Sequence, residues 1–152
     1  MKTNSLVIKE MEISYKPSKK VYDRGEIVGS ASAHHVLKKL YNHKTLACQE
    51  EFIVLYMNNA NIPIGYYRAS VGGMTSTTAD VRLILSVALK CMATAIIISH
   101  NHPSGNMRPS TADKVITIRI SQACKFFDIS LLDHIIITPH SGYYSFDDHG
   151  KL

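Results

Sequence analysis

The sequence is poor in cysteine, contains no long apolar run and has no internal repeat. These absences limit the classes of protein to which the chain can belong. Its three cysteines, Cys48, Cys91 and Cys124, are widely spaced and form no CxxC pair, which predicts reduced, buried thiols rather than a disulfide framework. The longest apolar runs, such as residues 95–98, are far too short to span a bilayer. The N-terminal residues lack the apolar segment of a secretory signal peptide. We therefore expect a cytoplasmic protein that does not enter a membrane.

Length, composition and charge indicate a globular domain with a basic N-terminal part. With 152 residues, of which 45% are hydrophobic and 19% are charged, the chain favours one domain, or one domain with a short arm, and a core without disulfides. The net charge of +5 resides in residues 1–45, which hold nine Lys or Arg against four Asp or Glu. We interpret this segment as a solvated basic face. The alternative is a nucleic-acid patch, without a known binding motif, formed by Lys16, Lys19, Lys20 and Arg24.

Hydrophobic periodicity and turn residues predict a mixed β-sheet flanked by helices, an α/β fold. Strands are expected over residues 6–15, 51–57, 62–71, 94–99, 131–138 and 143–146. Helices are expected over residues 30–41, 79–90 and 110–127, with a capping box at 77–80 and a loop at 100–109. The predicted organisation is a basic arm with one strand over residues 1–29, followed by one domain over residues 30–152.

The residues from His100 to Asp113 predict a site for a divalent metal. His100 and His102 follow a strand that we expect to be buried, and a persisting extended conformation would point both imidazoles to one side. They would leave the sheet at its carboxyl edge, where open α/β sheets usually bind ligands. The turn at Pro103 and Gly105 would return Asp113, in the first turn of the next helix, to the same place. Two imidazoles and one carboxylate leave a fourth position for water, as in catalytic zinc sites, where that water ionises near neutral pH.

Asp113 also has a simpler interpretation. The stretch from Ser110 to Asp113 is a capping box, with Ser110 as N-cap and Asp113 at the third helical position. An isolated His-x-His pair is also common in loops that bind no metal. The full spacing, His-x-His followed by seven residues, Ser, two residues and Asp, lies between a predicted strand and a predicted helix. This context favours the metal site.

The same spacing matches in full the JAMM motif of the JAB/MPN metallopeptidases. The surrounding sequence HNHPSGNMRPSTAD resembles the RadC branch of that group, as do QEEFIVLYMNN upstream and LLDHIIIT and YYSF near the C-terminus. The resemblance covers about residues 30–150 and is to the C-terminal domain of RadC alone, which commonly follows a helix-hairpin-helix region. It implies a JAB/MPN, cytidine-deaminase-like architecture, with zinc held by His100, His102 and Asp113. It also implies that Ser110 helps to stabilise the oxyanion and the metal-bound water.

The resemblance further implies an upstream glutamate as general base, for which Glu50 and Glu51 are the candidates. Strand periodicity places them on opposite faces, Glu50 with Phe52 and Glu51 with Ile53, and does not choose between them. The Glu-x-Phe pattern of RadC selects Glu50. The implied mechanism is metal-assisted hydrolysis, in which Glu50 takes a proton from water and delivers it to the leaving amine.

Three functions remain open from the sequence. The first is a zinc metallopeptidase acting on a peptide or isopeptide amide of a protein or peptide substrate. The second is a DNA-associated repair or recombination protein of the RadC type, and the third is a metal-binding interaction domain without turnover. A zinc nucleoside deaminase fits poorly, because that chemistry needs H-x-E with P-C-x-x-C. His134, within an apolar strand, is predicted to be a core histidine, with a role behind the metal ligands as the alternative.

Overall fold

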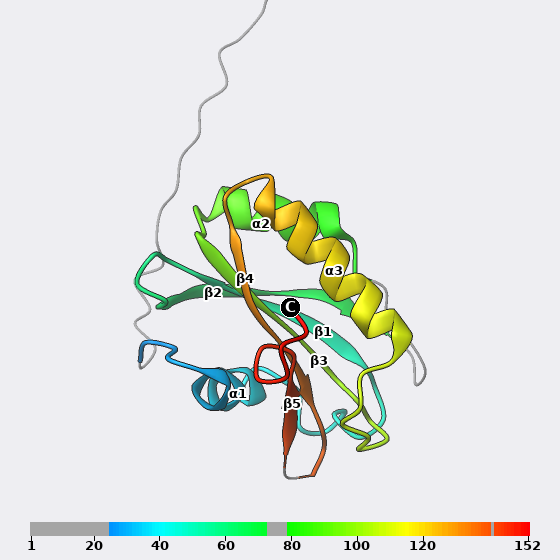
Figure 1. Cartoon of the computed structure of the whole chain (residues 1–152). Coiled ribbons are helices and arrows are strands. Elements are labelled where there is room, and N and C mark those ends of the chain that lie inside the picture. Colours follow the sequence, from blue (N-terminus) through cyan, green and yellow to red (C-terminus); the bar gives the residue numbers. More distant parts are fainter. Residues whose placement is uncertain (1–24, 73–78, 141) are drawn as a thin grey trace, which may run out of the picture.

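Residues 25–72, 79–140 and 142–152 are described by the computed structural model, and they form one five-stranded sheet with helices on both faces (Figure 1). In chain order the elements are α1 (Ser30–Lys38), β1 (Glu51–Met57), β2 (Pro63–Val71), α2 (Val81–Lys90), β3 (Ala95–Asn101), α3 (Thr111–Lys125), β4 (Ser130–Ile137) and β5 (Tyr143–Ser145). The predicted mixed α/β sheet is thereby confirmed. The strand predicted over residues 6–15 and the basic cluster at Lys16, Lys19, Lys20 and Arg24 lie outside the described residues.

The sheet has the strand order β2-β1-β3-β4-β5, with β3 at its centre. β3 runs parallel to β4 and antiparallel to β1, while β2 and β5 pair antiparallel at the two edges. All seven residues of β3 are buried, as expected for an apolar strand that is covered on both faces. The parallel pair β3 and β4 is joined through α3, so the carboxyl end of β3 leads directly toward the start of that helix.

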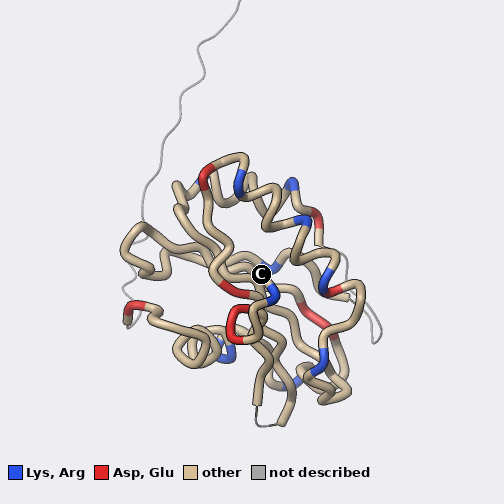
Figure 2. The backbone as a smooth tube through the Cα atoms, in the orientation of Figure 1, with Lys and Arg blue, Asp and Glu red and all other residues tan. Residues whose placement is uncertain are grey.

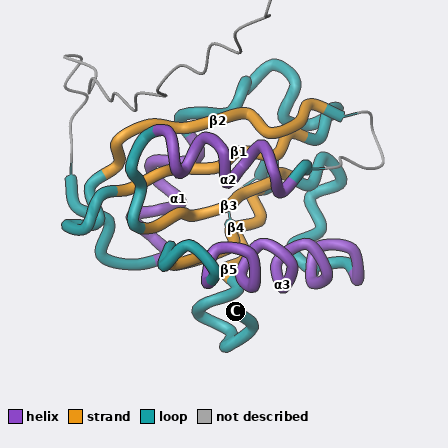
Figure 3. Tube along the Cα trace, turned by 90° about the horizontal axis from the view of Figure 1, so that it is seen from above, coloured by secondary structure: helices purple, strands orange, loops and turns teal. Residues whose placement is uncertain are grey.

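Alternation along β1 divides the core into two halves. Ile53, Leu55 and Met57 pack on the side of α1, together with residues of β3 and β4. Phe52 and its same-face neighbours pack on the opposite side, under α2 and α3. Seen from above, α2 and α3 lie next to one another, with α2 against β2 and α3 against β4 (Figure 3). This division confirms the predicted faces of β1.

Several element ends differ by one to three residues from the sequence-based expectation. β3 continues to Asn101 rather than ending at Ser99, because His100 and Asn101 still pair with β4. α1 ends at Lys38 rather than Tyr41. α2 begins at Val81 rather than Ala79, since the Asp80 side chain accepts a hydrogen bond from the main-chain nitrogen of Arg82 and so provides the N-cap. The first two residues of the predicted capping box, Thr77 and Thr78, lie outside the described residues.

The prediction that all three thiols are buried is wrong for one of them. Cys124 is buried in the core and Cys91 is half-buried at the end of α2, but Cys48 is exposed in the turns before β1. Turn residues on the surface carry no periodic burial signal, so a lone cysteine there is easily assigned to the core. None of the helices in the described ranges combines the length and apolarity needed to cross a bilayer.

Candidate metal centre

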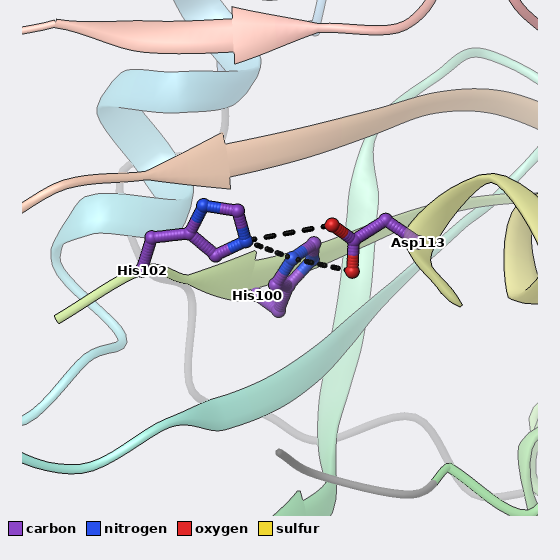
Figure 4. Close-up of side chains that lie close together, drawn as sticks. All are labelled: His100, His102 and Asp113. Carbon is purple, nitrogen blue, oxygen red and sulfur yellow. Dashed lines mark hydrogen bonds and ion pairs between the residues drawn. The ribbon is translucent and has the colours of Figure 1, made fainter. Parts of the chain in front are cut away.

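The end of β3 and the start of α3 bring the three predicted metal ligands together. His100 lies within β3, His102 follows the strand directly, and Asp113 lies in the first turn of α3. His100 Nε2 is 2.9 Å from His102 Nε2 and 3.1 Å from Asp113 Oδ1, and His102 Nε2 is 3.5 Å from Asp113 Oδ2. The three side chains point toward one another (Figure 4). Their ligand atoms all lie within 4.8 Å of each other, so this cluster could hold a metal ion.

The capping box at the start of α3 is what orients Asp113. The Ser110 hydroxyl accepts a hydrogen bond from the Asp113 main-chain nitrogen at 3.2 Å, and Asp113 Oδ2 accepts one from the Ser110 main-chain nitrogen at 2.6 Å. The carboxylate is therefore held in place by the helix terminus while its oxygens also face both imidazoles. The two interpretations that the sequence offered for Asp113, helix cap and member of the cluster, are both true of the structure.

A run of buried hydrogen bonds fixes which nitrogen of His100 faces the cluster. The Thr117 hydroxyl must donate to the Asp113 carbonyl at 2.6 Å, because a carbonyl can only accept. The Thr117 oxygen is then left to accept from His134 Nδ1 at 2.6 Å, and His134 Nε2 accepts from His100 Nδ1 at 2.8 Å. Burial lowers the pKa of His134 well below 6.5 and keeps its ring neutral, as this direction of donation requires. A neutral His100 thus presents an unprotonated Nε2.

The loop after β3 orients His102 so that its Nε2 also faces the cluster. Its Nδ1 lies 2.6 Å from the Asn106 carbonyl oxygen and must donate to it, so a neutral His102 also presents an unprotonated Nε2. Together with the Asp113 carboxylate, three acceptors then face one another without a donor. Such an arrangement requires a cation, either protons on the imidazoles or a metal ion.

The electrostatics of the cluster favour that cation. Burial alone would raise the pKa of Asp113, but hydrogen bonds from the imidazoles of His100 and His102, when these carry protons on Nε2, outweigh it and hold this pKa well below its usual range. Burial also disfavours a charge on His102, yet Asp113 and the Asn106 carbonyl raise its pKa above 6.5. The cluster therefore favours the anionic form of this carboxylate, which attracts positive charge to the space between the rings.

The spacing of these atoms fits a metal of the size of zinc. Donor atoms at about 2.0–2.2 Å from one zinc ion stand roughly 3.3 Å apart in a tetrahedron, and the observed separations of 2.9, 3.1 and 3.5 Å fall around that value. Each imidazole also has a fixed partner on its other nitrogen, His134 for His100 and Asn106 for His102, as metal-binding histidines generally do.

Glu50 and Glu51, which periodicity alone could not separate, have different surroundings. β1 pairs with β3 so that Phe52 lies opposite His100, and continuing this register by two residues places Glu50 opposite His102. Glu50 lines the same cavity as His100 and Asp113, and burial raises the pKa of its carboxyl group. Glu51 faces the other half of the core and forms an ion pair with Arg68. Only Glu50 of the two is therefore placed near the cluster.

Asn101, between the two histidines, was not singled out from the sequence. Its side chain points away from the imidazoles, accepts from the main-chain nitrogen of Glu51 and donates to the carbonyls of Leu46 and Gln49, each at 2.8 Å. These bonds fasten the chain on both sides of Glu50 to the end of β3. The orientation of Asn101 could have been predicted, because strand alternation turns a residue between two ligands to the opposite face.

A cavity of about 240 Å³ opens beside the cluster. It is lined by Glu50, Phe52, Ala79, His100, Ala112, Asp113, Val115, Ile116 and Arg119. Ser110 is exposed at the helix start, and its hydroxyl hydrogen remains available to donate because its oxygen accepts from Asp113. His134 is both a satisfied core residue, stacked on Phe146 with ring centroids 4.6 Å apart, and the partner behind His100.

A mixed sheet between α1 and the pair α2 and α3, with two histidines at a strand end facing a helix-borne aspartate, defines a JAB/MPN-type α/β domain. The family model of the RadC-like JAB domain matches residues 27–151. The chain therefore belongs to the RadC-like JAB domain family.

The chain is similar to UPF0758 proteins of several bacteria. The chain is 39% identical over 147 residues to a UPF0758 protein of Porphyromonas gingivalis, covering 96% of this chain and 63% of that protein. A UPF0758 protein of Streptococcus gordonii is 37% identical over 142 residues, which are 93% of this chain and 62% of the relative. One of Flavobacterium johnsoniae is 48% identical over 101 residues, or 66% and 44% of the two chains. This chain thus spans less than two thirds of the length of these curated relatives.

Proposed function

We propose that this chain is a metal-dependent hydrolase that uses zinc, held by His100, His102 and Asp113, to cleave a peptide or isopeptide amide bond. The observation that carries the proposal is the convergence of one carboxylate and two imidazoles. The Nδ1 protons of the imidazoles are directed away from the cluster, toward His134 for His100 and toward the Asn106 carbonyl for His102. Two imidazoles and one carboxylate are the ligand set of a catalytic rather than a structural zinc ion, because they leave a position for water. When bound, such a metal polarises a carbonyl and makes water nucleophilic near neutral pH.

The surrounding residues supply the proton transfers and the charge stabilisation. Glu50 lines the cavity next to the cluster, where its carboxylate accepts the proton of the attacking water and delivers it to the leaving amine. Its raised pKa brings the carboxylate closer to the basicity that this exchange needs. Ser110 donates its free hydroxyl hydrogen to the oxyanion that develops on the carbonyl. Phe52 keeps one side of the cavity apolar and limits the access of further water.

Removal and return of the metal test this proposal. The purified protein should contain close to one zinc ion per chain, because one cluster of three ligands is present in the described part of the chain. Dialysis against a chelator should abolish hydrolysis of a library of internally quenched peptides, and zinc added back in equimolar amount should restore it. Elemental analysis and fluorescence report the two quantities separately. Metal binding without hydrolysis of any peptide or isopeptide would instead indicate a metal-binding interaction domain.

The hydrogen bonds behind His100 lead to a second expected result. Thr117→Val keeps the shape of the side chain but removes the acceptor for His134 Nδ1, so the direction of donation from His100 Nδ1 to His134 Nε2 is no longer fixed. We expect the zinc affinity to fall by roughly 10- to 100-fold, the usual effect of losing a partner behind a ligand. Competition with a chromophoric chelator measures this affinity without any substrate. Thr117→Ser, which retains the hydroxyl, should stay within a few-fold of the wild type; equal affinities for all three proteins would show that these bonds do not orient His100.

A further inference from the structure

One face of α3 forms a wall of the cavity beside the candidate metal centre. The cavity-lining residues Ala112, Val115, Ile116 and Arg119 are spaced at i, i+3, i+4 and i+7, which places them along a single side of the helix. Val115 is 51% exposed although it is apolar. The wall therefore runs from Asp113 along a small apolar surface to a basic end at Arg119. Basic positions recur along α3 in Figure 2, but the lining of the cavity includes Arg119 alone among them.

The guanidinium group of Arg119 has no hydrogen bond or ion pair with any residue of the described ranges. By contrast, Arg68 pairs with Glu51, and Arg82 pairs with Asp80. A guanidinium presents five donors in a planar fork that matches a carboxylate. The lining of the same cavity also includes two acidic residues, Glu50 and Asp113. Along α3, the lining thus changes from the acidic Asp113 at the cluster to the basic Arg119, with Val115 and Ile116 between them.

The length of this wall sets where a bound group would lie. Arg119 follows Asp113 by six residues on α3, which corresponds to roughly 9 Å along the helix axis. An extended peptide advances about 3.3 Å per residue. A group bound by Arg119 is therefore two to three residues away from the amide bond at the cluster, and the residue between them passes over Val115 and Ile116.

We propose that Arg119 selects substrates that carry a carboxylate two or three residues from the scissile amide, with an apolar side chain between. This inference rests on the proposed hydrolase function and names its substrate class, an acidic apolar peptide segment. The carboxylate belongs to an Asp or Glu side chain or to a free C-terminus, since both present the same group to a guanidinium. A cationic residue at the same place meets Arg119 and is disfavoured.

Peptides that differ only at the carboxylate test the selection. Internally quenched octapeptides with Glu, Gln or Lys placed in turn at each position are compared for kcat/KM with the zinc-loaded protein. A comparison of peptides that end in a free carboxylate with peptides that end in an amide tests whether Arg119 recognises a C-terminus. We expect Glu to exceed Gln by about tenfold at one position, two or three residues from the cleaved bond. Fluorescence anisotropy of labelled peptides measures binding to the zinc-loaded Glu50→Gln variant. We expect the Glu peptide to bind this variant more tightly than the Gln peptide.

Three variants on α3 separate a specific contact from general charge. Arg119→Gln should remove the preference for Glu over Gln, and Arg119→Glu should reverse it in favour of Lys. Lys125→Gln changes the net charge equally but lies outside the cavity lining, and it should keep the preference of the wild type. Thermal unfolding confirms that each variant is folded before the comparison is made.

The two measurements distinguish failure of this inference from failure of the proposed function. Hydrolysis that shows no carboxylate preference, or a preference that survives in Arg119→Gln, overturns the role of Arg119 and leaves the hydrolase intact. Carboxylate-dependent binding lost in Arg119→Gln, without hydrolysis by the wild type, supports Arg119 and contradicts the hydrolase. A short single-stranded oligonucleotide that binds more tightly than every acidic peptide, and depends on Arg119, assigns this residue to phosphate and overturns the inference.

Discussion

Replacement of Asp113 by asparagine is expected to remove the metal from the protein and, with it, all hydrolysis. The side chain keeps its size and can still accept from the Ser110 main-chain nitrogen, so the change mainly removes the negative charge that faces His100 and His102. Zinc bound by a full set of ligands is worth about 10–16 kcal/mol. The loss of one ligand of three should therefore weaken binding by roughly a thousandfold, at 1.4 kcal/mol for each factor of ten. Elemental analysis and competition with a chelator measure this loss directly.

The double role of Asp113 requires a control for helix stability. Ser110→Ala removes the hydroxyl that accepts from the Asp113 main-chain nitrogen but leaves the three candidate ligands unchanged. It should lower the free energy of unfolding by about 1 kcal/mol, as the loss of an N-cap usually does, and it should retain zinc. If Asp113→Asn binds zinc as tightly as the wild type, Asp113 is a cap alone and the proposed metal centre is wrong. If Ser110→Ala also loses zinc, metal binding depends on the helix cap as well as on the carboxylate.

Most of the strands and helices could be predicted from the sequence because apolar runs and hydrophobic periodicity mark buried elements. The apolar run of β3 predicted a strand covered on both faces, and period-two geometry predicted that Phe52 and Ile53 lie on opposite faces of β1; both are present. The errors lie at element ends, where tertiary contacts take over from periodicity. At the end of β3, the Asn101 side chain bonds three main-chain groups, two in the segment before β1 and one at the first residue of β1. No local pattern in the sequence specifies such long-range partners.

For the candidate site as well, local features could be predicted from the sequence and long-range contacts could not. The convergence of His100, His102 and Asp113 followed from a strand, a turn and a helix that are adjacent in the sequence. The bonds that orient these side chains could not be predicted in the same way, because His134 is separated from His100 by a whole helix and Thr117 is an ordinary helical residue until its neighbours are known. The role of Arg119 could likewise not be predicted from the sequence, because it depends on which face of α3 borders the cavity.

Replacement of Glu50 by glutamine is expected to lower turnover by about 10²- to 10⁴-fold while the protein keeps its zinc. The reason is that a carboxamide has nearly the same shape as a carboxylate but cannot take a proton from water, and general acid–base catalysis typically contributes a factor of this size. Glu50 lines the cavity without being one of the three clustered ligands, so metal binding should change little. Single-turnover hydrolysis at fixed zinc occupancy measures the chemical step apart from metal affinity.

Glu26→Gln is the matched control for Glu50→Gln, because it removes the same charge at an exposed position that borders a different cavity. It should leave both zinc content and turnover unchanged. A Glu50→Gln protein that still hydrolyses peptides at the wild-type rate would mean that the proton passes through another group, and Glu50 would then have no part in the chemistry. A protein that loses zinc together with turnover would make Glu50 a ligand rather than a base. Retention of zinc with loss of hydrolysis is the one combination that a purely metal-binding interaction domain cannot produce.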